Sequence, residues 1–397
     1  MKTVRISIDE GPIGVYVHVP VCASKCPYCD FNSVAARPPE ERYVKTVLSE
    51  LAMTLEREAL VRPLSSIYVG GGTPSLLSPE AIAAITGGIR SAFGFRGRIE
   101  ATIEVNPDTV SASKLKGYKD AGMNRLSIGV QSLRDALLST LGRPHSATRA
   151  VEAFHEGREA GFTNAGVDLI FGVPGQGVKD WEEDVRSIIA LGPEHVSVYG
   201  LAIEESTPYA RLERDGVIRK PPEEDELAMY VSAIALLKDA GFHHYEISNF
   251  SRPGHEARHN RAYWRGKDYV GLGAGAHSHL SYPQWGRRWW NAASPDDYMQ
   301  RIESGRDAIA GSEPLGVAEA LDEAIMLGLR DLEAGMDALS FERRFNKPPT
   351  EVFSAWAALA QDGFLEEASG TLRLGAKGIP VANEVSSRLA GSAILTY

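Results

Sequence analysis

All three cysteines of the chain, Cys22, Cys26 and Cys29, lie within eight consecutive residues, with the spacing C-x3-C-x2-C. Three thiols cannot all form intramolecular disulfides, and a closed structural zinc site normally has four protein ligands. The simpler interpretations of these cysteines are a redox pair of the C-P-Y-C form with one further cysteine, or an incomplete zinc knuckle. An iron–sulfur cluster fits three thiolates better, because four-iron clusters usually have four thiolate ligands. Three cysteines would therefore leave one iron open to another ligand.

Further residues that could do chemistry follow other short β-rich runs. The glycines of GGGTPS (Gly70 to Ser75) would let the backbone approach a ligand closely. Glu104 lies in EVNP, Gln131 in GVQS, Arg143 in LGRPHS and Asp168 in DLIFGV. Each residue alone is equally consistent with a cap or an ion pair. Together they fall at or near the carboxyl ends of successive runs, where parallel α/β barrels build their sites.

These residues require an alternating β/α framework. Apolar β-rich runs alternate with amphipathic stretches at helical spacing, which predicts parallel strands joined by helices. Six such units favour a partial parallel (β/α)6 barrel, with a doubly wound sheet as the second choice. The expected strands are 14–19, 66–70, 100–105, 125–130, 165–173 and 194–201, with a further strand in HHYEIS. The expected helices are 41–58, 79–93, 147–160, 178–191 and 223–239.

The last part of the chain has a different pattern. Helical stretches at 318–331, 336–344 and 350–361 precede two short strand-like runs around Ser369–Gly370, as in a hairpin. Three helices and a hairpin suggest a small winged-helix-like α+β domain over residues 311–397, after a barrel over 1–310. Residues 311–397 carry seven Lys or Arg against thirteen Asp or Glu, a net charge of −6. A DNA-reading wing would be basic, so we expect a docking or covering role.

Composition excludes several classes of protein. Apolar residues make up 43% and charged residues 24% of the 397, as in globular proteins with a real core. The formal net charge of −10 argues against a nucleic-acid partner. No window approaches the roughly 20 apolar residues of a membrane span, and MKTVRISIDEGPIG lacks the apolar core of a secretory signal. We expect a cytoplasmic protein without a membrane anchor. In the reducing cytoplasm, clustered cysteines are more often metal ligands or redox groups than structural disulfides.

The cysteine motif resembles the cluster-binding motif of radical S-adenosylmethionine (SAM) enzymes. In that family the fourth iron of a [4Fe–4S] cluster is chelated by the amino and carboxylate groups of SAM. An electron from the cluster then cleaves SAM to a 5′-deoxyadenosyl radical. The resemblance implies that Cys22, Cys26 and Cys29 hold the cluster, and that Tyr28 lies near the adenine. The expected remaining SAM contacts are Tyr16, Gly71, Gly72, Thr73, Glu104, Gln131, Arg143, Asp168 and Ala202.

The resemblance also implies roles for these contacts. The Gly71–Gly72–Thr73 backbone would hold the methionyl amino group, and the Arg143 guanidinium would pair with the carboxylate. Glu104, Gln131 and Asp168 would bind the ribose and nearby polar groups.

Over nearly its whole length the sequence resembles one radical SAM subfamily. It comprises the oxygen-independent coproporphyrinogen III oxidases and their relatives, the HemW haem chaperones. The oxidases have a further cysteine two places after the third, where this chain has Phe31 in CDFNS. They also have a longer N-terminal segment, whereas about thirteen residues precede the first strand here. Both differences argue against oxidative decarboxylation of coproporphyrinogen.

The segment HNRAYW (His259 to Trp264) is similar to the H-N-x-x-Y-W motif associated with haem binding in the chaperones. Imidazole is a usual ligand of haem iron, and Tyr263 and Trp264 offer flat apolar surfaces. Without the resemblance, one histidine beside aromatics in a loop is more often a packed structural residue. His277 and His279 are alternative or additional ligands. The aromatic segment QWGRRWWN (284–291) could line a cleft or pack in the core.

The sequence thus predicts a haem chaperone on a radical SAM scaffold. It would bind a [4Fe–4S] cluster and SAM at the residues given above. It would bind haem through His259, Asn260, Tyr263 and Trp264. It would deliver haem to acceptor haemoproteins such as respiratory membrane enzymes. Coproporphyrinogen III dehydrogenase activity is the alternative. A third reading is a radical enzyme acting on another substrate, and a homodimer stays open.

Overall fold

Six β-strands, each followed by a helix, form the first half of the chain. The computed structural model describes residues 11–393, apart from the side chains of residues 95 and 96. The six strands run parallel and lie side by side in chain order, because each helical crossover returns the chain to the same end of the sheet. They are β1 (Ile13–Val19), β4 (Leu64–Gly71), β5 (Phe95–Val105), β6 (Arg125–Gln131), β7 (Ala165–Phe171) and β8 (His195–Gly200).

These strands belong to an open twelve-stranded sheet, which confirms the predicted partial barrel. Because the six parallel strands keep their chain order, the sheet has none of the order reversal of a doubly wound fold. One edge is extended by β11, parallel to β1, and by three antiparallel strands that the sequence analysis does not predict. The six added strands are β11 (Tyr269–Leu272), β12 (His277–Leu280), β13 (Arg287–Asn291) and β14 (Ile309–Pro314) at one edge, and β10 (Asn249–Ser251) and β9 (His243–Glu246) at the other.

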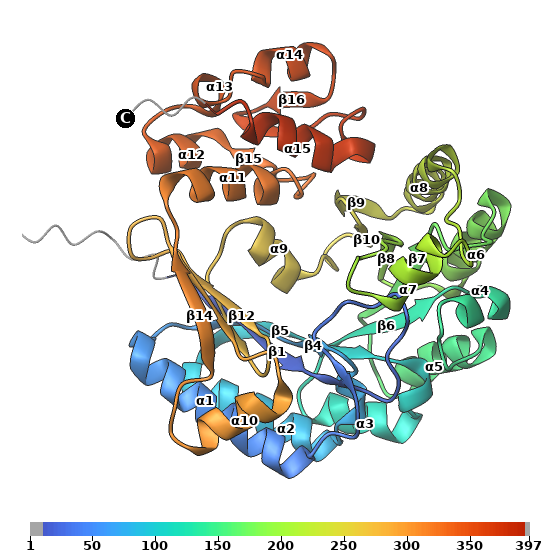
Figure 1. Ribbon diagram of the computed structural model, residues 1–397, viewed down its shortest axis with the longest axis vertical. Coiled ribbons are helices and arrows are strands. Elements are labelled where there is room, and N and C mark those ends of the chain that lie inside the picture. The colour runs from blue at the N-terminus through green and yellow to red at the C-terminus, as the bar shows by residue number, and fades with distance from the viewer. Residues whose placement is uncertain (1–10, 394–397) are drawn as a thin grey trace, which may run out of the picture.

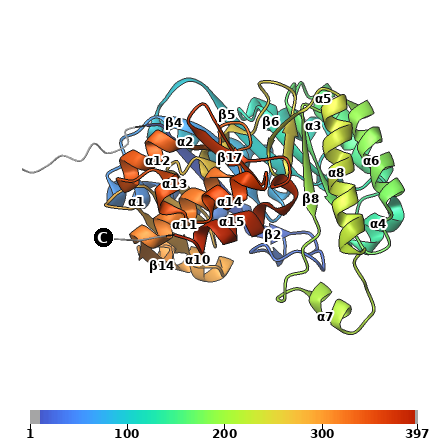
Figure 2. The same cartoon turned by 90° about the horizontal axis from the view of Figure 1, so that it is seen from above.

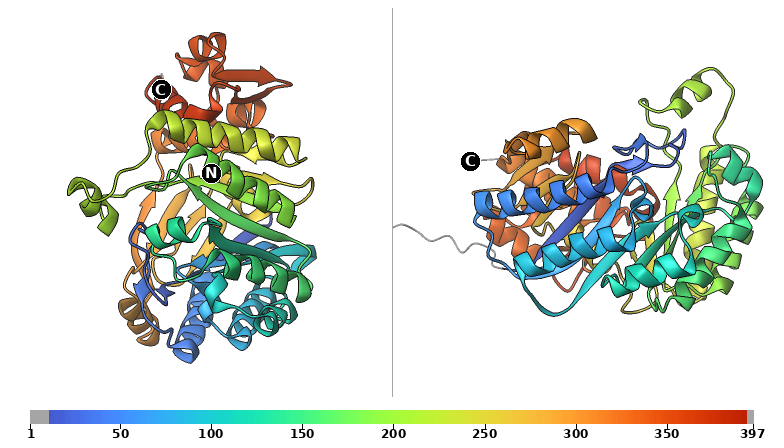
Figure 3. Two further views of the ribbon diagram at one scale, coloured as in Figure 1. Left: turned by 90° about the vertical axis from the view of Figure 1, so that its right-hand side faces the viewer. Right: turned by 90° about the horizontal axis from the view of Figure 1, so that it is seen from below.

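Helices cover the outer face of the sheet and leave the inner face for other side chains (Figures 2 and 3). In β1, Val15 and Val17 are fully buried and belong to the main apolar core, which also contains residues of these helices. Tyr16 and His18 point to the opposite, inner face, because side chains alternate along a strand. The covering helices are α1 (Glu40–Glu58), α2 (Pro79–Phe93), α3 (Ala112–Asp120), α5 (Ala147–Glu159), α6 (Val178–Leu191) and α8 (Glu223–Asp239).

The C-terminal part has an apolar core of its own and lies above the open side of the barrel (Figure 1). Strands β16 (Leu365–Ala368) and β17 (Thr371–Leu374) form the predicted hairpin. Ser369 and Gly370 both have positive φ, as a two-residue hairpin turn requires. The remaining elements are β15 (Met336–Asp337), α11 (Val317–Gly328), α12 (Ala338–Phe345), α13 (Pro349–Val352), α14 (Trp356–Gln361) and α15 (Ala382–Ala390).

Two local expectations are wrong. The helix expected at 350–361 is interrupted at Phe353, which is extended, forms a β-bridge with Ala393 and buries its ring. The HNRAYW segment, expected in a loop, is the helix α9 (Arg258–Trp264). Its first N–H groups, those of Arg258 and His259, each donate to the Glu100 carboxylate at 3.0 Å. This carboxylate satisfies helix N–H groups that have no partner within the helix.

The boundary expected between residues 310 and 311 remains a prediction, and β14 runs across it. Residues 1–10, where the sequence predicts no secretory signal, lie outside the described residues. Within residues 11–393, no helix has the length and apolar character needed to cross a bilayer.

Candidate functional site

The three cysteines line one wall of a cavity of about 370 Å³ at the carboxyl ends of the parallel strands. Cys22 ends the short strand β2 (Val21–Cys22), whose pairing with β3 (Val34–Ala35) closes the base of the cysteine loop. Within the loop, the Cys29 N–H donates to the Cys26 carbonyl at 3.1 Å. None of the three thiols is in a disulfide.

The residues of this loop fit a four-iron cluster. Arg143 Nη1 lies 3.8 Å from Cys26 Sγ, so a positive charge borders the thiols where an anionic cluster would bind. Within residues 11–393, no three His, Cys, Asp or Glu side chains lie close enough together for one metal ion. Thiolates of a four-iron cluster bind different irons, so they need not converge on one point. The donor set is therefore three separate sulfur atoms around one cavity.

A glycine-rich segment passes directly beside the cysteine loop. The N–H groups of Gly72 and Thr73 donate to the carbonyls of Val19 and Val21, both at 2.8 Å. A Cβ atom on Gly72 would lie 2.5 Å from the Val21 carbonyl oxygen and 3.0 Å from Cys22 Sγ. Gly71 has a φ of 112°, a conformation that glycine adopts readily. The segment needs glycine here because the two backbones are too close for a side chain.

Two carboxylates face the same cavity. Glu104, at the end of β5, accepts hydrogen bonds from Tyr68 Oη at 2.7 Å and the Gly71 N–H at 3.1 Å. Burial, together with the nearby Asp168 carboxylate, raises the pKa of Glu104 to about 7. Asp168, in β7, accepts from Ser127 Oγ at 3.0 Å, and burial raises its pKa as well. This wall can accept hydrogen bonds from hydroxyl groups and attract a cation.

The cavity lining also includes a guanidinium and a strained turn. Arg143 Nη2 donates to Asn106 Oδ1 at 2.7 Å and to the Gly129 carbonyl at 3.1 Å. Gln131 has a φ of 69°, and the Ser132 N–H donates back to the Val130 carbonyl at 2.9 Å. A non-glycine residue in this tight turn is strained, and such strain is frequent at functional sites.

The cavity brings together most of the residues expected at the cluster and SAM. Tyr16 is the exception, because its ring borders a second cavity on the inner face of β1. The sequence analysis missed several polar residues that line the cavity. They could have been found as polar side chains within an apolar strand or directly next to a motif. The residues expected at the cluster and SAM that line the cavity are Cys22, Cys26, Cys29, Tyr28, Gly71, Gly72, Thr73, Glu104, Gln131, Arg143, Asp168 and Ala202, and the missed ones include Asn106, Arg125, Ser127, His195 and Ser197. Asn260, expected at haem, also lines this cavity.

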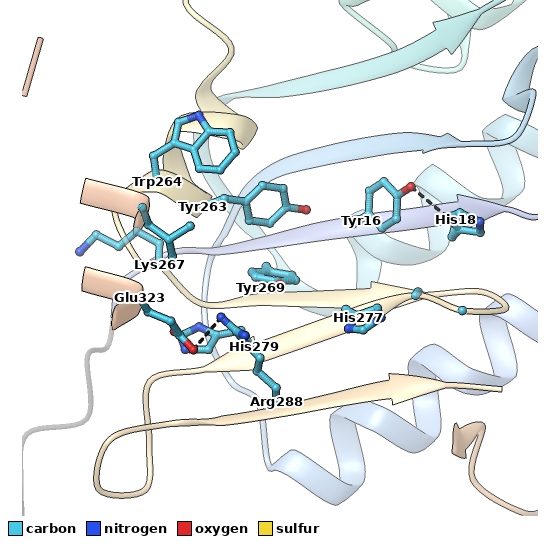
Figure 4. A pocket seen from close by; sticks show the side chains of 14 residues that line it. Tyr16, His18, Tyr263, Trp264, Lys267, Tyr269, His277, His279, Arg288 and Glu323 are labelled. Atoms are coloured by element: carbon cyan, nitrogen blue, oxygen red, sulfur yellow. Dashed lines mark hydrogen bonds and ion pairs between the residues drawn. The ribbon is translucent and has the colours of Figure 1, made fainter. Parts of the chain in front are cut away.

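The second cavity measures about 420 Å³ and lies between α9, the β11–β13 edge of the sheet and α11. Figure 4 shows Tyr263 and Trp264 on one side and His277 and Arg288 on the other. The Arg288 Nη2 atom pairs with Glu323 Oε1 at 2.7 Å. The labelled lining residues are Tyr16, His18, Tyr263, Trp264, Lys267, Tyr269, His277, His279, Arg288 and Glu323.

Helix α9 forms a wall of both cavities. Asn260 lines the cysteine cavity, whereas Tyr263 and Trp264, three and four residues later, line the second one. His259 lines neither cavity and is only 1% exposed, with its ring stacked on Tyr68 at 5.2 Å between centroids. The four residues of the motif that are expected at haem therefore lie in three different surroundings.

The tryptophans of the flanking aromatic segment pack against other side chains and line neither cavity, and Arg288 is the residue of this segment that borders the second cavity. Trp289 is 2% exposed and belongs to the main core. The next residue, Trp290, stacks on His277 at 5.9 Å between ring centroids. The two tryptophans face opposite sides of β13, because side chains alternate along a strand.

Comparison with known proteins identifies the family. The Radical SAM superfamily pattern matches residues 16–188, and the HemN C-terminal domain pattern matches residues 317–381. The heme chaperone HemW of Bacillus subtilis (strain 168) is 34% identical over 381 residues, which cover 95% of this chain and 98% of that protein. The chain belongs to the HemW family of radical SAM proteins. The family predicted from the sequence is thereby confirmed.

Other HemW-family relatives come from distant organisms. Heme chaperone HemW of Mycobacterium tuberculosis (strain ATCC 25618 / H37Rv) is 35% identical over 385 residues, covering 96% of this chain and 95% of that protein. The mitochondrial radical S-adenosyl methionine domain-containing protein 1 of Bos taurus is 36% identical over 320 residues, covering 80% and 72%. Membership of the radical SAM superfamily implies a [4Fe–4S] cluster and SAM as cofactors.

A solved structure confirms the fold of this HemW-family chain. Coproporphyrinogen III oxidase (HemN) from Escherichia coli, described as a radical SAM enzyme, superposes with a TM-score of 0.81. The match covers 97% of this chain and 91% of the other, at 22% sequence identity. It therefore shows a shared architecture, including the C-terminal part, and nothing about a shared reaction.

Proposed function

We propose that this HemW-family protein is a haem chaperone that holds a [4Fe–4S] cluster and SAM in the cysteine cavity and haem in the second cavity. The observation that carries the proposal is the position of α9, which forms a wall of both cavities. A helix shared by two ligand sites offers a direct physical connection between them. The printed names of the relatives, heme chaperone HemW, support haem as the cargo.

In the cysteine cavity, Cys22, Cys26 and Cys29 would bind three irons of the cluster. When bound, the cluster and SAM together supply reductive cleavage chemistry of the radical SAM type. The Arg143 guanidinium would pair with the SAM carboxylate and the Gly71–Thr73 backbone would receive its amino group. Glu104 and Asp168 would accept hydrogen bonds from ribose hydroxyls, with Gln131, Tyr28 and Ala202 completing the pocket.

The second cavity has the properties that haem requires. Its volume is typical of small-molecule sites, and it combines aromatic walls with a few polar groups. Tyr263, Trp264 and Tyr269 offer faces for a porphyrin, imidazoles offer iron ligands, and Arg288 and Lys267 offer cations for the propionates. Tyr16, expected at SAM, belongs instead to this second site.

The wider role follows from the cargo. Haem would pass from this cavity to acceptor haemoproteins, with respiratory membrane enzymes as the proposed recipients, and the protein would act in the cytoplasm. The C-terminal part contributes Glu323 and Leu327 of α11 to the cavity wall, so an acceptor that binds this part would lie next to the proposed haem site. A homodimer is compatible with this proposal and is not needed by it.

The decisive experiment compares two tetrapyrroles under anaerobic conditions. The cluster is reconstituted, and haem and coproporphyrinogen III are added separately in the presence of SAM and a reductant. We expect saturable haem binding in the absorbance spectrum and no vinyl-bearing product from coproporphyrinogen III. Formation of protoporphyrinogen with release of carbon dioxide would instead establish the oxidase, despite Phe31 in the position of the additional cysteine.

Variants of the aromatic wall provide the control. Trp264→Ala should weaken haem binding by roughly 10- to 100-fold, because it removes a large apolar surface worth about 1.5–3 kcal/mol. The exposed Tyr282→Ala, outside both cavities, should bind haem like the unmodified protein. Equal affinities in the two variants would contradict the placement of haem in the second cavity.

A further inference from the structure

Four histidines lie in or near the second cavity, and their surroundings differ sharply. His18, His277 and His279 border it, and His259 lies behind it in α9. We propose that His277, not His259, is the axial ligand of the haem iron, and that His259 is a positioning residue that orients Tyr263. This inference rests on the proposed function, because it takes haem as the cargo of the cavity.

The contacts of His259 leave no ring nitrogen for a metal. Its Nδ1 atom is hydrogen-bonded to Ser66 Oγ at 2.8 Å, and its Nε2 atom to Tyr263 Oη at 2.7 Å. A neutral imidazole has one donor and one acceptor nitrogen, and two hydroxyl partners satisfy both. Burial lowers the pKa of His259 to about 3, which keeps it neutral. Binding iron would require His259 to lose a buried hydrogen bond and to leave its stack with Tyr68.

Two of the remaining histidines are also unsuitable. His18 Nδ1 is bonded to Tyr16 Oη at 3.0 Å and its Nε2 to the Asn32 carbonyl at 2.7 Å. His279 is 6% exposed, and its Nε2 is buried with no hydrogen-bond partner among the described residues. A Cβ atom on Gly286 would lie 3.3 Å from that nitrogen, so the β12–β13 connection covers it.

His277 has what an axial ligand needs. It is exposed at the cavity, and within residues 11–393 neither ring nitrogen has a hydrogen bond. Its ring stacks on Trp290 of the adjacent strand, with an angle of 25° between the planes, which restricts its rotation. In the β12–β13 ladder, His277 pairs with Trp290 and His279 with Arg288.

The neighbouring charges fit the rest of the ligand. Arg288 is two residues from Trp290 along β13, so its backbone lies about 7 Å along the ladder from that of His277. A porphyrin bound to His277 would extend its carboxylate edge toward Arg288 and Lys267. Arg288 has five N–H donors, of which the ion pair with Glu323 uses one, so donors remain for a propionate. Tyr263, held by His259, would pack against the macrocycle from the side of α9.

The test is spectroscopic and uses the full chain with its cluster reconstituted. His277→Ala, His259→Gln and His155→Ala are titrated with haem, and the iron–imidazole signature is recorded by resonance Raman spectroscopy and electron paramagnetic resonance. His259→Gln keeps a neutral donor and acceptor and so preserves folding. His155, exposed on α5, is the matched control.

We expect His277→Ala to lose the iron–imidazole signature and to regain it when free imidazole is added. His259→Gln should keep the signature and weaken haem binding by roughly tenfold, because Tyr263 would be held less firmly against the macrocycle. His155→Ala should match the unmodified protein. Loss of the signature in His259→Gln but not in His277→Ala, or its retention in both, would overturn the assignment while haem binding stands. An unmodified protein that binds no haem would overturn the proposed function and this assignment with it.

Discussion

At the scale of single residues, the cysteine cavity combines reactive groups whose neighbours set their charge. Arg143 contacts both Cys26 and Asn106, so the same guanidinium connects the thiols to the polar end of β5. Glu104 and Asp168 share a buried wall, which raises the pKa of each carboxyl. Arg143 thus borders the cysteines, whereas Glu104 and Asp168 lie near a second buried guanidinium, that of Arg125, which also lines the cavity.

Replacing any one cysteine should remove the cluster. Cys22→Ala, Cys26→Ala and Cys29→Ala each leave two thiolates, too few to hold a four-iron cluster whose fourth iron already lacks a protein ligand. We expect iron content after anaerobic reconstitution to fall from about four atoms per chain to near zero. The iron–sulfur absorbance should disappear with it. Ser24→Ala, in the same loop, is the control, and unchanged absorbance in a cysteine variant would exclude that thiol as a ligand.

SAM affinity should depend on the ionisation of Glu104. Its pKa is raised to about 7, so the carboxyl is neutral at lower pH and becomes a carboxylate as the pH rises through 7. The carboxylate accepts hydrogen bonds from hydroxyls and attracts the SAM sulfonium, so affinity should increase by up to roughly tenfold from about pH 6 to about pH 8. Titration of SAM into the anaerobic, cluster-loaded protein measures this change.

Glu104→Gln should flatten that pH profile, because the amide does not titrate. The amino group of SAM titrates equally with both proteins, so the difference between the two profiles isolates Glu104. An identical pH dependence in the variant would show that another group is responsible.

At the scale of elements, close backbone approach explains why glycines follow β4. Gly72→Ala would place a methyl group against the Val21 carbonyl and Cys22 Sγ and push the cysteine loop away from the cavity. We expect iron incorporation to fall by roughly half or more, and the variant to be destabilised by about 1–3 kcal/mol, as for overpacking. Iron content and thermal unfolding measure both effects.

Gly87, within α2, is the matched control, because a Cβ atom there meets nothing within 4 Å. Gly87→Ala should leave iron content unchanged and stabilise the protein by about 0.5–1 kcal/mol, since alanine is the better helix former. Equal iron loss in the two variants would mean that the effect of Gly72 is general and not local.

The elements that could be predicted from the sequence are those with a strong periodic pattern. The six parallel strands and their long helices follow from apolar runs and amphipathic spacing, and most expected SAM residues line one cavity because parallel strands end on one rim. Strand β13 was not predicted because RRWWN lacks a simple alternation of apolar and polar residues, and its two tryptophans face opposite sides, with Trp289 in the core and Trp290 stacked on His277. Helix α9 was missed because the cap of its N-terminus, Glu100, lies 158 residues earlier in the chain.

At the scale of the whole molecule, one buried carboxylate joins α9 to the C-terminal part. Asp331 is fully buried, and it accepts from Arg265 Nε at 2.9 Å and Arg261 Nη2 at 3.2 Å. Arg261 lies in α9 and Arg265 directly follows it, whereas Asp331 follows α11, which lines the second cavity. The two parts also meet elsewhere, because Ile379 packs against both apolar cores and the Leu332 N–H donates to the Tyr245 carbonyl at 2.9 Å. The ion pairs of Asp331 add a direct link between α9 and the end of α11, the two walls of the proposed haem site.

Asp331→Ala should loosen this connection, because Arg265 loses this buried carboxylate and Arg261 keeps only its ion pair with Glu333. The free energy of unfolding should fall by about 3 kcal/mol. This is the lower end of the range for removing one member of a buried ion pair, because Arg265 is partly exposed. Urea unfolding followed by circular dichroism should show an earlier transition of the C-terminal part, and haem affinity should fall while iron content is unchanged. Asp362→Ala, an exposed aspartate after α14, should alter none of these quantities. If Asp331→Ala lowered stability but not haem affinity, α11 would be a passive cover, and the spacing between the two walls would not control binding.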